Sequence, residues 1–224
     1  MAPKDLKNIY IDIDGTILDV SDRIYRIYKD FLRRQKNKYL AKEVYIKLKR
    51  KKAPNSLILK KTDAERLLPA FESYWTSSIE TGRYLALDTI MPAKRRTLAF
   101  LKKHFRVFLI TTRNNKNGLK KELKMNDLLD SFDKLLVARR KSSEGGWMAK
   151  YKLIKKSGRW DKKSIIVGDT EADILVGKKL EIMTVGVLDG MRTKGILKSH
   201  HPDFLIQSLD KLPTLLKRRG IGIK

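Results

Sequence analysis

Short apolar runs alternate with amphipathic helical patterns along most of the chain. The runs are rich in β-branched residues and favour buried strands, at residues 9–13, 106–110, 135–138, 165–167, 182–187 and 204–206. Apolar stripes with helical spacing lie between them, at residues 92–104, 115–123, 147–156, 172–179 and 209–219. Strands that alternate with helices are typical of a parallel sheet covered on both faces, so the pattern predicts an α/β fold.

A different pattern separates the first two of these strands. From Ser21 onward, one apolar stripe with spacing i, i+3, i+4, i+7, i+8 joins Ile24, Ile27, Tyr28, Phe31 and Leu32. A shorter stripe joins Leu40, Val44 and Leu48, and a later helical segment carries Phe71, Tyr74 and Trp75. We therefore expect an all-helical unit at residues 17–90, inserted into a core made of residues 1–16 and 91–224.

Two acidic pairs follow apolar strands. Asp12 and Asp14 end the first strand, and residues two apart in an extended chain point to the same side. Two carboxylates at the end of a buried strand repel each other, and a bound cation removes that penalty. Asp14-Gly15 alone is explained by an ordinary turn, but Asp169 and Asp173 follow a second apolar strand in the same way. The sequence thus predicts a metal site at the carboxyl edge of the sheet.

Three segments together resemble the motifs of one enzyme superfamily. The segment IDIDGTILD is similar to the first motif of the haloacid dehalogenase superfamily, and VGDTEADI is similar to its fourth. Between them, FLITTRN resembles the second motif, an apolar strand that ends in Thr. The resemblance is to the phosphatase branch, close to the phosphoglycolate phosphatase-like group. It implies a Rossmann-like core with helices on both faces and a small α-helical cap inserted after the first motif.

The resemblance also implies a role for each acidic residue. Asp12 would be the nucleophile that forms a phosphoaspartate, because an ionised carboxylate can attack phosphorus. Asp14 would protonate the leaving oxygen and then take a proton from the attacking water. The implied cofactor is Mg²⁺, held by Asp12, the main-chain oxygen of Asp14, and Asp169. Asp173 would support these metal ligands from one helical turn further on.

The substrate phosphate would lie between the second motif and a lysine. Thr111, Thr112 and the backbone of Gly15 would bind its non-bridging oxygens. The superfamily also uses a lysine to neutralise the phosphoaspartate, and the sequence departs from the usual pattern here because no Lys-Pro pair precedes Gly168-Asp169. The candidates are Lys141, Lys150 and Lys152. We favour Lys150, since KYKLI resembles the start of the corresponding helix in related members.

Composition narrows the class of protein further. The chain has 224 residues and no Cys, which excludes disulfides and thiolate ligands and fits a reducing cytoplasm. It has no long apolar segment that would span a membrane, and the first residues run into a strand without a signal-peptide pattern. Its formal net charge is +26, from 51 Lys and Arg against 25 Asp and Glu. Such a charge attracts anions, although a general lysine-rich bias explains it equally well.

The sequence favours one function and leaves two others open. The first is a Mg²⁺-dependent phosphatase of small, anionic phosphate esters. The second is a phosphomutase with the same chemistry, and the third is a nucleic-acid-binding protein or polynucleotide-end phosphatase that uses the basic insert. Residues 29–61 hold 13 Lys and Arg and 2 acids, a net charge of 13 − 2 = +11. They form no recognisable nucleic-acid motif, so we expect at most weak, non-specific binding to nucleic acid. No motif indicates an oligomeric state.

Overall fold

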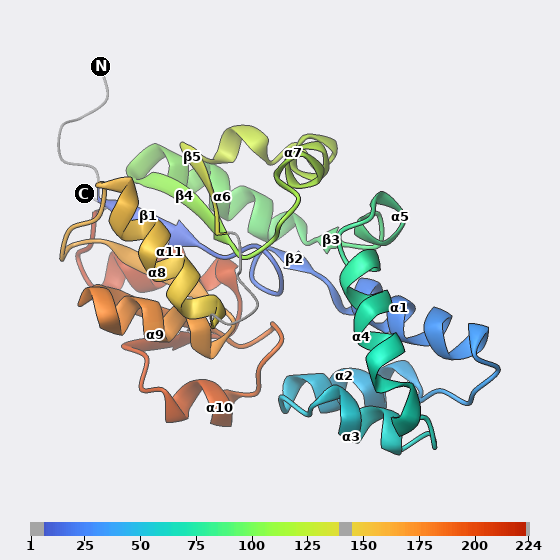
Figure 1. The fold of residues 1–224 in the computed structure, drawn as a ribbon. Helices are drawn as coiled ribbons and strands as arrows, with labels where there is room; N and C mark the ends of the chain where they lie inside the picture. The colour runs from blue at the N-terminus through green and yellow to red at the C-terminus, as the bar shows by residue number, and fades with distance from the viewer. Residues whose placement is uncertain (1–6, 139–144, 223–224) are drawn as a thin grey trace.

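A single parallel sheet forms the centre of the larger part of the molecule (Figure 1). The computed structural model describes residues 7–138 and 145–222. In this part of the chain the sheet has the strand order β5-β4-β1-β6-β7-β8, with every neighbouring pair parallel. The strands are β1 (Asn8–Ile11), β4 (Arg106–Thr111), β5 (Lys134–Val137), β6 (Ile165–Gly168), β7 (Met183–Val187) and β8 (Phe204–Ile206). The predicted α/β fold is therefore confirmed.

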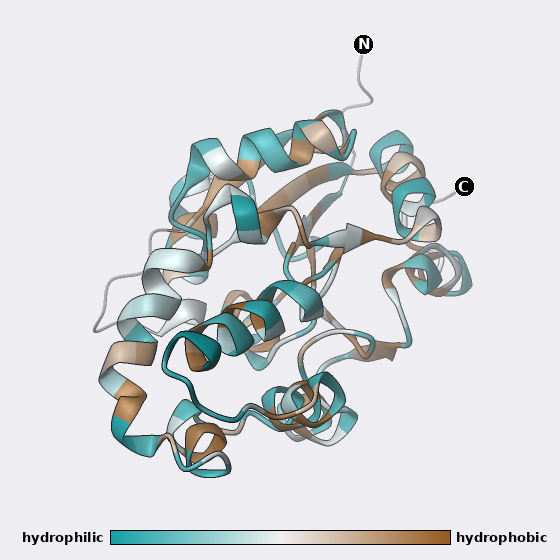
Figure 2. Cartoon of the chain, turned by 90° about the vertical axis from the view of Figure 1, so that its right-hand side faces the viewer, coloured by the Kyte–Doolittle hydropathy of each residue, from teal (hydrophilic) through white to brown (hydrophobic). Residues whose placement is uncertain are grey.

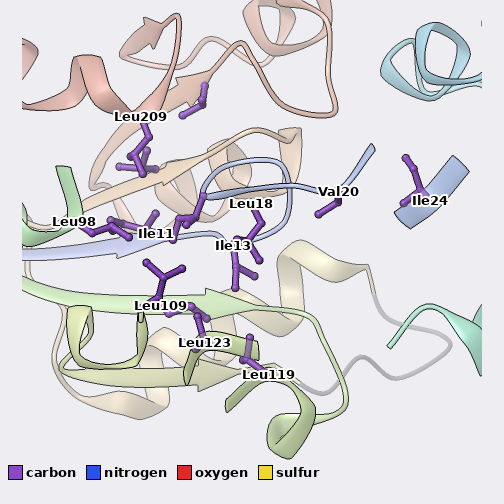
Figure 3. Close-up of a cluster of buried hydrophobic side chains, with 14 of the residues drawn as sticks. Ile11, Ile13, Leu18, Val20, Ile24, Leu98, Leu109, Leu119, Leu123 and Leu209 are labelled. Atoms are coloured by element: carbon purple, nitrogen blue, oxygen red, sulfur yellow. The ribbon is translucent and has the colours of Figure 1, made fainter. Parts of the chain in front are cut away.

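Helices cover both faces of the sheet because its strands are apolar on both sides. Along β1, Ile9 and Ile11 point to one face and belong to a large apolar cluster with the helices α6, α7 and α11 (Figure 3). Tyr10 points to the other face and packs in a second cluster with α8 and α9. These helices are α6 (Pro92–His104), α7 (Lys116–Met125), α8 (Gly146–Ser157), α9 (Glu171–Leu180) and α11 (Leu212–Arg218). Figure 2 shows the division, with brown apolar strands inside and mostly teal helices outside.

The chain changes direction across the sheet beside β1. It runs from β1 to β4 and β5 on one side, and then crosses to β6, β7 and β8 on the other. In open α/β sheets, ligands bind at the carboxyl ends of the strands where such a reversal occurs. Strand β1 ends at Ile11, two residues earlier than predicted, so Asp12 and Asp14 lie in the loop at this edge.

Residues 21–85 form a separate group of helices on one side of the sheet (Figure 1). They are α1 (Ser21–Arg34), α2 (Lys42–Arg50), α3 (Asn55–Lys60), α4 (Leu68–Ser78) and α5 (Gly82–Leu85). The short helix α10 (Lys194–Ser199) is not part of this group and follows β7. The two crossings between this group and the sheet run side by side as a short antiparallel pair, β2 (Leu18–Asp19) and β3 (Thr89–Ile90). The expectation of an all-helical insert was wrong for these four residues, which are too few to form a recognisable strand pattern. The domain boundaries at residues 16 and 90 remain a prediction.

Aromatic side chains form the interior of this helical group. Tyr28 and Tyr45 stack with ring centroids 4.4 Å apart, and Phe31 packs against Phe71 at 5.2 Å. The predicted stripe through Val44 was wrong, because the Val44 side chain is 45% exposed whereas the neighbouring Tyr45 is fully buried. The inner face of α2 therefore contains Tyr45 in place of the predicted Val44.

No helix within residues 7–138 and 145–222 has the length and apolar character needed to cross a lipid bilayer.

Candidate active site

Three acidic side chains meet at the carboxyl edge of the sheet. Asp12 follows β1, and its backbone N–H donates to the carbonyl of Val167 in β6 at 3.0 Å. Asp169 follows β6, and Asp173 lies in the first turn of α9. One carboxylate oxygen from each of the three lies within 4.8 Å of the others, and all three side chains are buried. The sequence predicted that the ends of the strands would bring Asp12, Asp169 and Asp173 together, and the structure places them side by side.

Lys150 enters this cluster from α8. Its ammonium group donates to Asp12 Oδ1 at 2.6 Å and to Asp173 Oδ1 at 2.6 Å, and only 3% of the residue is exposed. The other oxygen of Asp173 accepts a hydrogen bond from the Thr170 hydroxyl at 2.8 Å, which fixes the carboxylate at the start of α9. Of the other two candidate lysines, Lys152 is exposed and Lys141 lies outside the described residues.

The charges of this cluster fit a divalent cation. Burial raises the pKa of Asp12 well above its ordinary value, although Lys150 opposes the shift. Burial also raises the pKa of Asp169 to about 7, with repulsion from Asp173 adding to it. Burial disfavours the charged form of Lys150, but Asp12 and Asp173 outweigh it and raise its pKa. If fully ionised, three carboxylates and one ammonium would carry a net charge of −3 + 1 = −2 in a buried place, and a dication would offset this charge.

The backbone closes tightly around Asp169. Gly15 has φ = +83°, and a Cβ added to it would lie 2.2 Å from Asp169 Oδ2. Only glycine fits this position, because both the backbone angle and the space exclude a side chain. The carboxylate also accepts from the Met191 N–H at 2.5 Å and from the Thr16 hydroxyl at 3.3 Å. Asp169 is thus held from two loops, one after β1 and one after β7.

The second-motif residues lie at the same edge of the sheet. Thr111 is the last residue of β4, and its hydroxyl accepts a hydrogen bond from the Arg113 N–H at 3.3 Å. The residue is 2% exposed, whereas Thr112 is partly exposed. Strand β4 is the direct neighbour of β1, so Thr111 ends beside the Asp12 loop. Its expected role in phosphate binding remains a prediction.

Asp14 is paired with two arginines, a feature that the sequence did not reveal. Arg113 donates to both of its carboxylate oxygens, through Nε at 2.8 Å and Nη2 at 2.6 Å. Arg23, from α1, donates to Oδ1 at 2.5 Å. Burial alone would raise the pKa of Asp14, but the two guanidinium groups outweigh it and hold that pKa well below its ordinary value. The Asp14 side chain is therefore ionised in this arrangement.

Two more acids lie behind these arginines. Asp88, just before β3, lies 3.2 Å from both Arg23 and Arg113, and Glu122 of α7 pairs with Arg113. Burial raises the pKa of Asp88 to about 8, opposed by Arg23 and reinforced by the nearby Asp14 and Glu122. The sequence offered a signal only for Arg23, which lies one turn before Ile27 at the edge of the apolar stripe of α1. No pattern singled out Asp88 or Glu122.

A small cavity opens between the helical group and the sheet edge. Its volume is about 270 Å³, and it is lined in part by Gly15 and Gly190, which both pack against Asp169. Arg50 of α2 and the ion pair between the buried Lys94 and the partly exposed Asp189, at 2.9 Å, also line it. Arg50 donates to the carbonyl of Leu188 at 2.6 Å and so joins α2 to the loop after β7. The volume suits a small polar molecule.

A comparison with profiles of protein families identifies the family to which this chain belongs. A profile of the haloacid dehalogenase-like hydrolases matches residues 9–187, which is most of the chain. The protein therefore belongs to the haloacid dehalogenase-like hydrolase family, as the sequence motifs indicated. A comparison with curated protein sequences gave no match.

Solved structures with the same fold come from several bacteria. A haloacid dehalogenase-like hydrolase from Streptococcus pneumoniae is 15% identical, with a TM-score of 0.76 over 94% of this chain and 98% of that chain. A predicted phosphoglycolate phosphatase from Haemophilus somnus is 17% identical, with a TM-score of 0.72 over 94% of this chain and 97% of that chain. A protein named as a beta-phosphoglucomutase from Thermotoga maritima is 16% identical, with a TM-score of 0.69 over 95% and 99%. Because the sequence identities are this low, the similarity to these structures shows a shared fold only.

Proposed function

We propose that the protein is a Mg²⁺-dependent phosphatase that hydrolyses small phosphate monoesters through a phosphoaspartate at Asp12. One observation carries this proposal: the Lys150 ammonium bonds at once to Asp12 and Asp173 inside a buried group of three carboxylates. A lysine in this position neutralises charge where a phosphoryl group would be attached. The cytoplasmic location expected from the cysteine-free composition remains part of the proposal.

Asp12 and Lys150 would perform the first half-reaction. The Asp12 carboxylate attacks phosphorus, the bond from phosphorus to the ester oxygen breaks, and the leaving oxygen takes a proton. The Thr111 hydroxyl and the backbone N–H groups near Thr112 and Gly15 would hold the non-bridging oxygens. Lys150 remains beside the Asp12 carboxylate and offsets the charge of the transferred group.

The metal site would consist of Asp12, the main-chain oxygen of Asp14, and Asp169. Bound Mg²⁺ would supply positive charge to the phosphate oxygens and would lessen the repulsion among the acids. Asp173 would act indirectly, because its two oxygens are engaged by Lys150 and Thr170. It thus orients Lys150 and the start of α9.

Asp14 would serve both half-reactions in opposite protonation states. It must be protonated to give a proton to the leaving oxygen, and ionised to take a proton from the attacking water. The pairing with Arg23 and Arg113 favours the ionised state. The arrangement therefore keeps Asp14 in the ionised state from which the second half-reaction starts, and the first requires Asp14 to gain a proton and loosen from a guanidinium group.

The cavity beside Gly15 favours a small substrate over a polynucleotide end. Its volume of about 270 Å³ is near the lower limit of ordinary ligand pockets. A screen of phosphorylated metabolites, with Mg²⁺ present and absent, would identify the substrate class. Release of inorganic phosphate would distinguish hydrolysis from phosphate transfer between sugar hydroxyls, the phosphomutase alternative.

Hydrolysis of 4-nitrophenyl phosphate tests the mechanism. We expect turnover that requires Mg²⁺, stops in excess chelator, and is abolished by Asp12→Asn, while circular dichroism shows an unchanged fold. Acid-quenched wild-type enzyme should carry one phosphoryl group, which Asp12→Asn lacks. Equal turnover in Asp12→Asn would refute the proposed nucleophile.

A further inference from the structure

Four charged side chains form a closed ring that includes Asp14. Arg23 lies 2.5 Å from Asp14 and 3.2 Å from Asp88. Arg113 lies 2.6 Å from Asp14 and 3.2 Å from Asp88. Each carboxylate therefore lies between two guanidinium groups, and each guanidinium group lies between two carboxylates.

The ring joins both crossings between the sheet and the helical group. Asp14 lies in the loop after β1 and Arg23 near the start of α1, so these two residues bracket the first crossing. Asp88 immediately precedes β3, in the second crossing, and Arg113 follows β4. The placement of Asp14 thus depends on residues from both parts of the molecule.

Only one member of the ring is open to solvent. The side chains of Arg23, Asp88 and Arg113 are 3%, 0% and 4% exposed, whereas that of Asp14 is 30% exposed. A buried support that presents one accessible carboxylate is suited to orienting it.

The hydrogen bonds also distinguish the two oxygens of Asp14. Oδ1 accepts from both Arg23 and Arg113, and Oδ2 accepts from Arg113 alone among the described residues. The two-point contact with Arg113 fixes the plane of the carboxylate. Oδ2 therefore has more room than Oδ1 to accept a further hydrogen bond, for example from a water molecule.

We propose that Arg23 and Arg113 are positioning residues that orient Asp14 as the base of the second half-reaction. This inference rests on the function proposed above. In that step the water oxygen bonds to phosphorus, the bond from phosphorus to Asp12 breaks, and one water proton moves to Asp14. The products are the free Asp12 carboxylate and inorganic phosphate. Because Arg23 belongs to α1, the base is complete only when this helix of the insert is in place.

The test uses Arg23→Gln, Arg23→Lys and wild type with 4-nitrophenyl phosphate and Mg²⁺. This ester has a good leaving group, so its first half-reaction needs no proton from Asp14. Slower hydrolysis of the phosphoaspartate in Arg23→Gln should lower kcat and KM together by about tenfold or more, with kcat/KM nearly unchanged. The phosphorylated fraction of enzyme, measured after acid quenching, should rise. Arg23→Lys should recover part of kcat, because it restores the charge without the planar fork.

Arg26→Gln is the matched control. Arg26 lies on the same helix and pairs with Asp30 at 3.0 Å, away from the ring. We expect it to leave kcat, KM and the phosphorylated fraction unchanged. Thermal unfolding of all variants checks the fold, and Arg23→Lys serves alone if Arg23→Gln does not fold.

Two outcomes would overturn the inference while leaving the proposed function intact. One is a fall in kcat at constant KM without accumulation of phosphoenzyme, as a smaller folded fraction would give. The other is Arg23 variants that match wild type. Failure of the proposed function has a different signature, namely wild-type enzyme without Mg²⁺-dependent hydrolysis or without a phosphoryl group on Asp12.

Discussion

The ammonium of Lys150 lies 2.6 Å from Asp12 Oδ1, although the two residues are 138 positions apart in the sequence. The contact joins α8 to the loop after β1, and the same ammonium reaches Asp173 on α9. Lys150 thus partly compensates the buried carboxylates, so its removal should affect both stability and chemistry.

Lys150→Ala should reduce turnover of 4-nitrophenyl phosphate by about 100-fold or more, because the transferred phosphoryl group loses its adjacent positive charge. The variant should also lose roughly 3 kcal/mol of unfolding free energy in metal-free buffer, since it leaves buried carboxylates uncompensated. Added Mg²⁺ should recover part of that loss. Chemical denaturation with and without Mg²⁺ measures the second effect independently of activity.

Lys152→Ala is the control for this change, because Lys152 lies two residues away on the same helix and is exposed. We expect wild-type turnover. Should Lys152→Ala be the inactive variant instead, the assignment of Lys150 would be wrong.

Gly190→Ala should weaken metal binding without contacting a metal. An added Cβ at Gly190 would lie 2.2 Å from the Asp169 Cβ, so the acid must shift. We expect Mg²⁺ to raise the melting temperature of wild type, and this increase should be largely lost in Gly190→Ala. Gly195→Ala is a matched change, because nothing lies within 4 Å of a Cβ added there. An equal Mg²⁺ effect in wild type and Gly190→Ala would contradict the assignment of Asp169 as a ligand.

The fold and the centre of the site could be predicted because their signals are local in the sequence. Asp12 and Asp169 each follow an apolar strand, and parallel strands bring their carboxyl ends to one edge. Lys150 could be favoured but not separated from its neighbours, because a chain with 51 Lys and Arg offers many similar candidates. Its burial depends on how α8 packs against α9, which no short segment encodes.

The ring around Asp14 could not be predicted for a related reason. Charged residues such as Arg23 and Asp88 ordinarily lie on the surface, and burial becomes possible only when several of them compensate one another. That compensation links four segments that are far apart in the sequence. The buried Tyr45 and the exposed Val44 show a similar effect, because stacking on Tyr28 decided which face of α2 points inward.

Lys49 should make stability depend on pH. Burial, with repulsion from Arg192, lowers the pKa of Lys49 from 10.5 to about 8. Its described partners are the Asn55 side chain, at 3.2 Å, and the ring of Trp75. Between pH 8 and 10.5 the unfolded chain binds more protons at this group than the folded chain, so the unfolding free energy should rise with pH over this range.

Lys49→Met should therefore be more stable than wild type at pH 7, by about 2 kcal/mol when the partial exposure of Lys49 is taken into account. This difference in unfolding free energy should shrink above pH 8 and vanish near pH 10.5, because folded wild type then has a neutral Lys49, as the variant has a neutral Met. Denaturation at several pH values gives the comparison. Lys47→Met, at an exposed position of the same helix, should show no such pH dependence.

The basic insert should act on the substrate through its long-range field. Residues 29–61 carry a net charge of 13 − 2 = +11, and Arg50 in this segment lines the cavity next to Asp169. Tyr28 and Phe31 are buried, as their place on the predicted stripe indicated, and Tyr45 is buried too, so none of the three rings is available for stacking on bases. A field of this kind is screened over about 8 to 10 Å at ordinary ionic strength. Added salt should therefore raise KM steadily and leave kcat nearly constant.

A pair of charge-neutralised variants separates this field from the overall charge of the protein. The first replaces four exposed lysines of the insert by Gln: Lys36, Lys38, Lys60 and Lys61. The second replaces four exposed lysines elsewhere by Gln: Lys156, Lys163, Lys178 and Lys179. We expect the first variant to have a higher KM at low salt and a flatter salt dependence, and the second to match wild type. Equal effects in both variants would show that the salt dependence comes from the net charge of the whole protein. Tight, salt-resistant binding of a defined oligonucleotide would instead favour a nucleic-acid function.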